Sequence, residues 1–203
     1  MSRPRRELLS VRGAEPVGPY TLVRLERGSL APGTPGQFFM LEAPGCLLPR
    51  PLSLCLAPSN ELAFLIDPIG PGTTALAELQ TGQRIHVFGP LGNGYRLDVP
   101  RPLLVGGGIG IAPLPYLSQA LEQPPAVLGF RSEYHAEAAV LVPNAEVVID
   151  PVLVTDALAS GVLPEGRDIL ACGPEPMLRQ FQTELRRAGV RRHHIHREYF
   201  DWR

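Results

Sequence analysis

The sequence predicts two structural parts, an antiparallel β-barrel over residues 1–99 and an α/β domain with a parallel sheet over residues 100–203. Three observations indicate this. The first half holds short apolar segments bounded by turn residues, which is typical of small antiparallel barrels. After Pro100-Arg101-Pro102, strand-like and helix-like segments alternate, which indicates βαβ units. The 203 residues are 44% hydrophobic, enough for a core in each part.

The barrel strands are expected where apolar residues gather between turn residues. The first runs from Tyr20 to Leu25, before the turn-rich segment GSLAPGTPG. Four more segments follow in order: QFFMLEA (37–43), RPLSLCLA (50–57), ELAFLID (61–67) and RIHVFGP (84–90). Ser59-Asn60 is expected at the tip of a hairpin. The one helix-like piece runs from Thr73 to Leu79, and Gly82 ends it.

Strands and helices of the second half are expected in alternation. The strand-like segments are LLVGG (103–107), AVLGF (126–130), VVID (147–150), DILACG (168–173) and HIHREYF (194–200). The helix-like segments between them are APLPYLSQALE (112–122), SEYHAEAAVL (132–141) and PMLRQFQTELRRAG (176–189). This order predicts a parallel sheet with crossover helices.

Composition excludes several classes of function. The formal net charge is -1, whereas a nucleic-acid-binding chain carries a basic excess. No residue is lysine, which excludes enzymes with a Schiff-base lysine and ordinary P-loop NTPases. No metal site is predicted at His193, His194 and His196, because neighbours along a strand point to opposite faces.

The cysteines and the N-terminus indicate the cellular setting. Cys46, Cys55 and Cys172 are far apart, so no local zinc or iron–sulfur site is expected. Scattered cysteines indicate a reducing compartment. The segment MSRPRRELLSVRG lacks the apolar stretch of a signal peptide, and no apolar run reaches membrane-spanning length. A soluble, cytoplasmic protein is therefore expected.

Four glycines crowd the segment LLVGGGIGIAPLPYL (103–117), directly after the first strand of the α/β part: Gly106, Gly107, Gly108 and Gly110. Pro113 stands where a helix can begin. Helix N-termini favour phosphates, and ligands of open α/β sheets gather beyond the carboxyl ends of the strands. A tight turn with a positive φ explains one glycine, and the cluster favours a pyrophosphate site. The pattern is not GxGxxG, so a different nucleotide-binding family is expected.

Five motifs carry a family resemblance. GGGIGIAPL (106–114) and ACGPEPML (171–178) resemble the nicotinamide-nucleotide half of the ferredoxin–NADP reductase superfamily. RPLS (50–53) and GPGTTAL (70–76) resemble its flavin-binding and phosphate-binding motifs. GPLGNGY (89–95) is similar to one branch, the electron-transfer subunits of heterotetrameric bacterial dihydroorotate dehydrogenase. The order and spacing of the motifs match that branch over nearly the whole chain.

The resemblance implies one FAD held between the barrel and the α/β domain. Arg50 offers a planar cation with several donors, which suits a pyrophosphate, and Ser53 is expected near the flavin N5. Gly72 and Thr73 open a short helix whose amides, with the Thr hydroxyl, would hold phosphates. The flavin-binding residues implied are Arg50, Pro51, Leu52, Ser53, Leu65, Ile66, Asp67, Gly72 and Thr73.

The resemblance also implies a nicotinamide site in the second half. Its residues would be Gly106, Gly107, Gly108, Gly110, Cys172, Gly173 and Pro174. Ser53 and Cys172 are the candidate catalytic residues, although Cys172 alone fits a small buried hydrophobe equally well. Trp202 is implied as an aromatic cover of the flavin ring, with core packing of the last strand as the alternative.

The function implied is that of an FAD-dependent, NAD(P)-linked oxidoreductase subunit. It would pass electrons between a dihydroorotate dehydrogenase catalytic subunit and NAD, in pyrimidine biosynthesis, as part of a hetero-oligomer. Members of the branch carry four cysteines near the C-terminus that ligate a [2Fe–2S] cluster; this chain has none of them, so no cluster is expected.

Two alternatives stay open. One is a stand-alone NAD(P)H-dependent flavin or ferredoxin reductase, and the other is a non-catalytic flavin-bound subunit. The segment after VVID is shorter than in relatives, which makes nicotinamide binding less secure than flavin binding. Arg131 and Ser132 follow the second strand of the α/β part, where a 2′-phosphate could be bound, and NAD is favoured over NADP.

Overall fold

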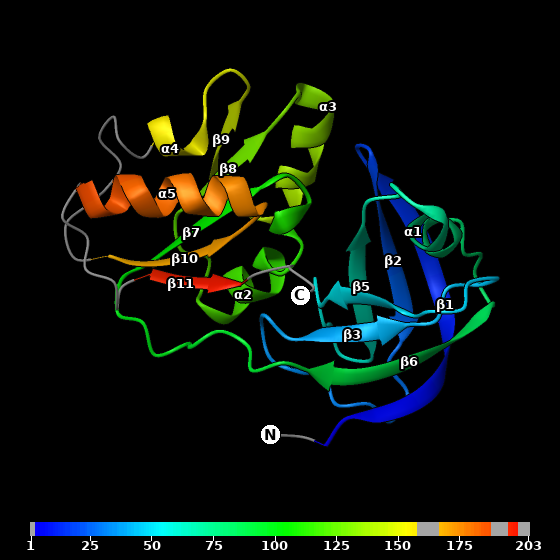
Figure 1. Cartoon of the computed structure of the whole chain (residues 1–203). Helices are drawn as coiled ribbons and strands as arrows, with labels where there is room; N and C mark the ends of the chain where they lie inside the picture. The colour runs from blue at the N-terminus through cyan, green and yellow to red at the C-terminus, as the bar shows by residue number, and fades with distance from the viewer. Residues whose placement is uncertain (1–2, 158–166, 188–194, 199–203) are drawn as a thin grey trace. The chain divides into compact units, whose positions relative to one another are not determined.

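A computed structural model describes residues 3–157, 167–187 and 195–198 (Figure 1). The chain divides into two compact units, Met1–Gly94 and Tyr95–Arg203. The first holds a six-stranded antiparallel sheet and the second a five-stranded parallel sheet. The predicted fold class, a barrel followed by an α/β domain, is confirmed.

Six strands build the barrel in the order β4-β3-β6-β1-β2-β5. Their bounds are β1 Arg5–Val17, β2 Tyr20–Glu26, β3 Phe38–Leu41, β4 Arg50–Ser53, β5 Glu61–Ile66 and β6 Arg84–Leu91. The chain beyond β4 returns to β5, because Leu56 forms an antiparallel bridge with Ala63. This bridge joins the two ends of the sheet order and nearly closes the barrel. Ser59 and Asn60 form the turn between the bridged residues, as predicted.

The longest strand, β1, was not predicted. Its first half pairs with β6 and its second half with β2, and an irregularity between Val11 and Gly13 separates the two. Leu9, Val11 and Gly13 are buried, with polar residues between them, so the period-2 pattern of a half-buried strand is present. The arginines around this short alternation hide it from a search for apolar runs.

The parallel sheet of the second unit has the order β11-β10-β7-β8-β9. Its strands are β7 Pro102–Gly107, β8 Ala126–Phe130, β9 Ala145–Ile149, β10 Asp168–Cys172 and β11 Ile195–Glu198. The helices are α2 Leu114–Ala120, α3 Glu133–Ala136, α4 Val154–Ala157 and α5 Glu175–Arg187, with 3-10 turns η1 Gly108–Ile111 and η2 Glu137–Leu141; α1 Pro71–Ala77 belongs to the barrel. The predicted helix over 132–141 is split into α3 and η2.

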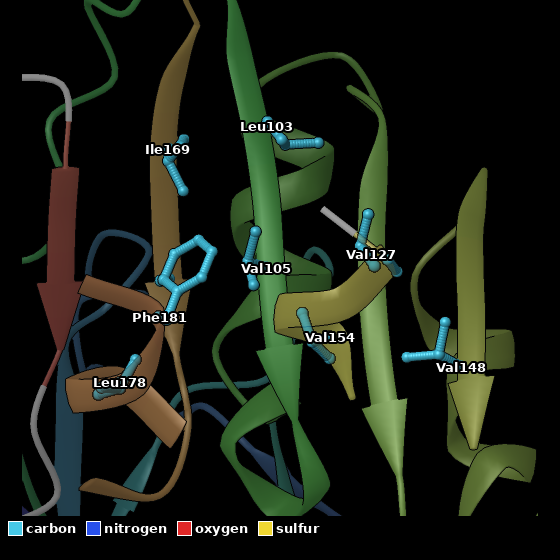
Figure 2. Packing of buried hydrophobic residues seen from close by; sticks show 10 residues of the cluster. Leu103, Val105, Val127, Val148, Val154, Ile169, Leu178 and Phe181 are labelled. Atoms are coloured by element: carbon cyan, nitrogen blue, oxygen red, sulfur yellow. The ribbon is translucent and has the colours of Figure 1, made fainter. Parts of the chain in front are cut away.

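One hydrophobic core cluster of the second unit lies between the sheet and the helices α4 and α5. Leu103 and Val105 of β7 pack with Leu178 and Phe181 of α5, and Val154 of α4 joins the same cluster (Figure 2). Leu178 and Phe181 are spaced to share one helix face. Successive β7 residues point to opposite faces of the sheet, so the glycines that end β7 face different helices.

In the parts of the chain that the structure describes, no helix is long and apolar enough to cross a membrane.

Candidate functional site

In the barrel, Arg50 and the start of α1 lie against each other. A Cβ placed on Gly72 would overlap the guanidinium of Arg50, which therefore fills the space a side chain would take. Arg50 Nη1 also donates a hydrogen bond to the carbonyl of Leu48 at 2.7 Å. The guanidinium is thus fixed beside the first turn of α1, where backbone N–H groups have no partner within the helix. A cation beside free N–H groups is an arrangement suited to an anionic group.

Thr73 uses its hydroxyl within its own turn. Thr73 Oγ1 accepts a hydrogen bond from the N–H of Gly70 and donates one to the carbonyl of Gly70, both at 3.1 Å. Thr73 therefore fixes the entry of α1. Its hydroxyl proton is engaged, so an oxyanion would meet the backbone amides of the turn rather than this donor.

The other barrel candidates lie on two strands of the same unit. Arg50 to Ser53 make up β4, with Arg50, Pro51 and Leu52 half-buried and Ser53 buried. Leu65 and Ile66 end β5 with fully buried side chains. Leu65 and Ile66 are thus buried as whole residues, backbone included, whereas Asp67 directly after them is half-buried.

Gln37 contributes to the fold of the GPLGNGY segment and was missed. Its side chain, only 8% exposed, accepts from the N–H of Thr34 at 2.9 Å and donates to the carbonyl of Gly92 at 2.7 Å. A Cβ on Gly94 would overlap the side chain of Thr34 and the carbonyl of Pro35. Gln37 thus ties this segment to the loop before β3. A lone glutamine before a strand carries no sequence signal for such a role.

In the second unit, three of the four clustered glycines are explained by packing. A Cβ on Gly106 would overlap Leu114 of α2, and one on Gly107 would overlap Met177 of α5. A Cβ on Gly110 would overlap the backbone of Gly173. Gly108 differs, because it has a positive φ of 52° and no atom near its missing Cβ. Close packing therefore accounts for most of the cluster, and Gly108 leaves the turn open on its outer side.

The turn after β7 meets the turn after β10. Gly106 and Cys172 are register partners on these parallel strands, so both turns leave the same edge of the sheet. The Cys172 side chain is fully buried, while Gly173 packs on Gly110 and Pro174 precedes α5. The sheet thus brings the predicted residues of this half together at its carboxyl edge, where ligands of open α/β sheets bind.

The strand β8 ends at the same edge and adds a polar cluster. Arg131 Nε donates to His135 Nε2 at 2.6 Å, and Ser132 Oγ lies 2.8 Å from His135 Nδ1. His135 was not predicted as a site residue, because its contact with Arg131 depends on the helical turn of α3, which places the two side chains next to each other.

Trp202 lies outside the described residues. Among the described residues, no group of three or more His, Cys, Asp or Glu side chains is placed to hold a metal ion.

Comparisons with known proteins place the chain in a family. No protein-family model matches it. It is 31% identical to the electron transfer subunit of dihydroorotate dehydrogenase B (NAD(+)) from Clostridium perfringens, over 76% of this chain and 68% of that protein. It is 38% identical to the subunit of the same name from a Geobacillus strain, over 73% of this chain and 66% of that protein. The chain belongs to the family of dihydroorotate dehydrogenase B electron transfer subunits. Its matches span about two thirds of these relatives' length.

Solved structures agree on the fold of this family member. A cytochrome P450 reductase from Amycolatopsis matches 97% of this chain and 70% of its own, with 25% identity and a TM-score of 0.79. The ferredoxin reductase in carbazole 1,9a-dioxygenase matches 98% of this chain and 70% of its own, with 23% identity and a TM-score of 0.84. The resemblance stated from the motifs is confirmed for both the superfamily fold and the branch.

Proposed function

We propose that this electron transfer subunit binds FAD and passes electrons between a dihydroorotate dehydrogenase catalytic subunit and NAD. The observation that carries the proposal is the guanidinium of Arg50 held against Gly72 at the start of α1. Family membership supports the choice of redox partner and of NAD. When bound, FAD supplies the hydride and single-electron chemistry, which protein side chains lack.

The barrel residues fit the diphosphate of FAD. Arg50 keeps Nη1 on the Leu48 carbonyl, and its remaining donors lie beside the first turn of α1. Because this bond already orients the guanidinium, little side-chain entropy is lost when an anion binds. Gly72 gives the guanidinium its space, and Thr73 holds the turn in shape. We infer that Arg50 and the amides of the turn bind the diphosphate.

The flavin ring would meet β4 and the end of β5. Since Leu65 and Ile66 are buried as whole residues, we infer that they support this surface from the core, and that Pro51 and Leu52 offer half-buried apolar surface to the ring. Ser53 and Asp67 are the polar side chains of this group, and Ser53 is the candidate hydrogen-bond donor to the ring.

The nicotinamide nucleotide would bind at the carboxyl edge of the parallel sheet. Gly108 leaves the turn after β7 open, and the backbone of Cys172, Gly173 and Pro174 lies beside that turn. Because Cys172 is buried as a whole residue, we infer that it shapes the turn and does not itself contact the nucleotide. We propose NAD rather than NADP, since His135 already engages the guanidinium of Arg131 that would otherwise hold a 2′-phosphate.

The proposed assembly is a hetero-oligomer with a dihydroorotate dehydrogenase catalytic subunit, in pyrimidine biosynthesis. We propose the cytoplasm as its location, because the cysteines Cys46, Cys55 and Cys172 are all free thiols, as expected in a reducing compartment. Fractionation of cells that express the chain with a C-terminal tag tests the location.

Flavin binding tests the proposal at Arg50. The purified chain is titrated with FAD, and quenching of flavin fluorescence gives the affinity. Arg50→Gln should weaken FAD binding by about tenfold or more, corresponding to about 1.4 kcal/mol, because a charge-assisted contact to the diphosphate is lost. Arg6→Gln is the matched control, since Arg6 pairs with Glu42 at 2.7 Å on the surface of the same barrel. Equal affinities for both variants would contradict the proposed cradle.

Electron transfer is tested with the FAD-loaded chain under anaerobic conditions. NADH should bleach the visible flavin absorbance, and NADPH should do so far more slowly. If neither NADH nor NADPH bleaches the flavin absorbance, the proposed electron transfer is contradicted, and the alternative of a non-catalytic flavin-bound subunit is supported. Bleaching without co-purification of a dihydroorotate dehydrogenase catalytic subunit would instead support a stand-alone reductase.

A further inference from the structure

A hollow of about 400 Å³ lies in the barrel unit between the start of the chain and the segment after β2. It is lined by Arg3, Arg5, Arg27, Ser29, Leu30 and Ala31. None of these residues belongs to the proposed flavin or nicotinamide sites. The hollow has the size of a small-molecule pocket.

Its lining carries three guanidinium groups and no carboxylate. Arg27 donates to the carbonyls of Leu30 at 2.7 Å and Ser59 at 3.2 Å, so it is held in place by neutral groups. Among the described residues, Arg3 and Arg5 form no ion pair. The positive charge of the hollow is therefore not neutralised by the residues that line it.

Other arginines of the same unit behave differently. Arg6, which follows Arg5 on the opposite face of β1, pairs with Glu42 at 2.7 Å. Arg12 pairs with Glu26 at 3.1 Å, and Arg24 pairs with Glu15 at 2.5 Å. Three arginines for which the described residues provide no acidic partner thus gather around one hollow, whereas Arg6, Arg12 and Arg24 are each paired with a glutamate.

The loop that lines one side of the hollow is held by a carboxylate of β1, Glu7, which is not itself part of the lining. Both oxygens of Glu7 accept the N–H of Ser29, and Glu7 Oε2 also accepts its hydroxyl at 2.8 Å. Gly28, at a positive φ of 58°, allows this close approach, because a Cβ there would overlap Glu7. Glu7 is the nearest acid along β1, and its oxygens are used to fix the loop.

We propose that this hollow binds a small molecule that carries a polyphosphate group. Guanidinium groups bind phosphoryl oxygens through paired hydrogen bonds, and a cluster of three matches a group with several negative charges. A concave site of this volume favours a small ligand over the flat surface of a protein partner. The site is independent of the proposed function, since it shares no residue with the flavin cradle.

Calorimetric titration with inorganic tripolyphosphate at low ionic strength tests the proposal. The chain is first saturated with FAD so that the Arg50 region is occupied. Binding should be saturable and should weaken by about tenfold in Arg5→Gln, because an exposed side chain that contributes charge is removed without loss of packing. Arg6→Gln, one position away on the opposite face, should change the affinity by less than about twofold.

Arg50→Gln separates this proposal from the proposed function. Tripolyphosphate binding that survives in Arg50→Gln but is lost in Arg5→Gln supports the hollow, whatever the outcome of the flavin titration. Equal losses in Arg5→Gln and Arg6→Gln would show a non-specific charge effect and overturn the proposal. Sulfate binding with the same affinity would indicate an adventitious ion only. Tighter binding of a polyglutamate peptide than of tripolyphosphate would overturn the proposal of a small-molecule ligand and indicate that the hollow binds an acidic protein segment.

Discussion

The guanidinium of Arg50 occupies the space that a side chain at position 72 would fill. Gly72 has no positive φ, so its backbone alone would accept alanine. The two residues come from separate motifs, RPLS and GPGTTAL, and each could be named from the sequence. Their contact could not be predicted, because it depends on how β4 and the start of α1 are brought together by the barrel.

Gly72→Ala should therefore weaken FAD binding through Arg50. The added methyl group displaces the guanidinium, and a loss of about tenfold in affinity is expected, with a change in stability below about 1 kcal/mol. Gly70→Ala is the control, since Gly70 has an extended backbone and open space at its Cβ position. Fluorescence titration gives the affinities. If Gly72→Ala weakens binding further in an Arg50→Gln background, its effect does not act through Arg50.

Cys55 links the stability of the barrel to alkaline pH. Burial raises the pKa of the Cys55 thiol from 9.0 to about 12, against a smaller lowering by the hydrogen bond with the backbone of Leu65. The unfolded chain loses this proton at lower pH than the folded chain. The contribution of the thiol to stability is thus complete below pH 9 and falls between pH 9 and about 12, by about 1.4 kcal/mol per pH unit.

Urea unfolding at pH 8 to about 10.5 checks this linkage. Cys55→Ala should lower stability at pH 8, because it leaves a small cavity, and its stability should fall less steeply above pH 9 than that of the native chain. Cys46→Ala, at a half-buried position, should keep the native slope. Parallel curves for the native chain and Cys55→Ala would argue against the shifted thiol.

At the scale of elements, the two turns at the carboxyl edge of the parallel sheet are packed backbone to backbone. Gly110 lies so close to Gly173 that any side chain at position 110 would overlap the backbone of Gly173. The sequence indicated a ligand as the reason for the glycine cluster, and it could not reveal that another turn is the neighbour. Of the four clustered glycines, Gly108 alone combines an open side with a positive φ.

Substitutions in this turn should separate packing from backbone strain. Gly110→Ala should destabilise the second unit by about 2–3 kcal/mol, because the backbone of Gly173 must move. Gly108→Ala should cost only about 1–2 kcal/mol, the strain of a left-handed alanine. Unfolding in urea compares the variants. Similar losses for both would mean that the turn yields easily at Gly110.

At the scale of the whole molecule, the fold class followed from the change from apolar segments to alternating strands and helices. The β8 segment, AVLGF, was predicted with the bounds that the structure shows. β1 was missed, because its alternation is carried by Leu9, Val11 and Gly13 among charged residues. Contacts between distant segments, such as that of Gln37 with Gly92, could not be predicted, because a single sequence does not show which loops lie next to each other in the fold.

One strand of the barrel carries two sets of partners. Since β1 pairs with β6 along its first half and with β2 along its second, it can leave neither neighbour without loosening the other. The barrel should therefore open as one cooperative unit. Amide hydrogen exchange should give the same opening free energy for Leu9 and for Glu15, which face β6 and β2 respectively, and a clearly lower value for either half would reveal separate foldons.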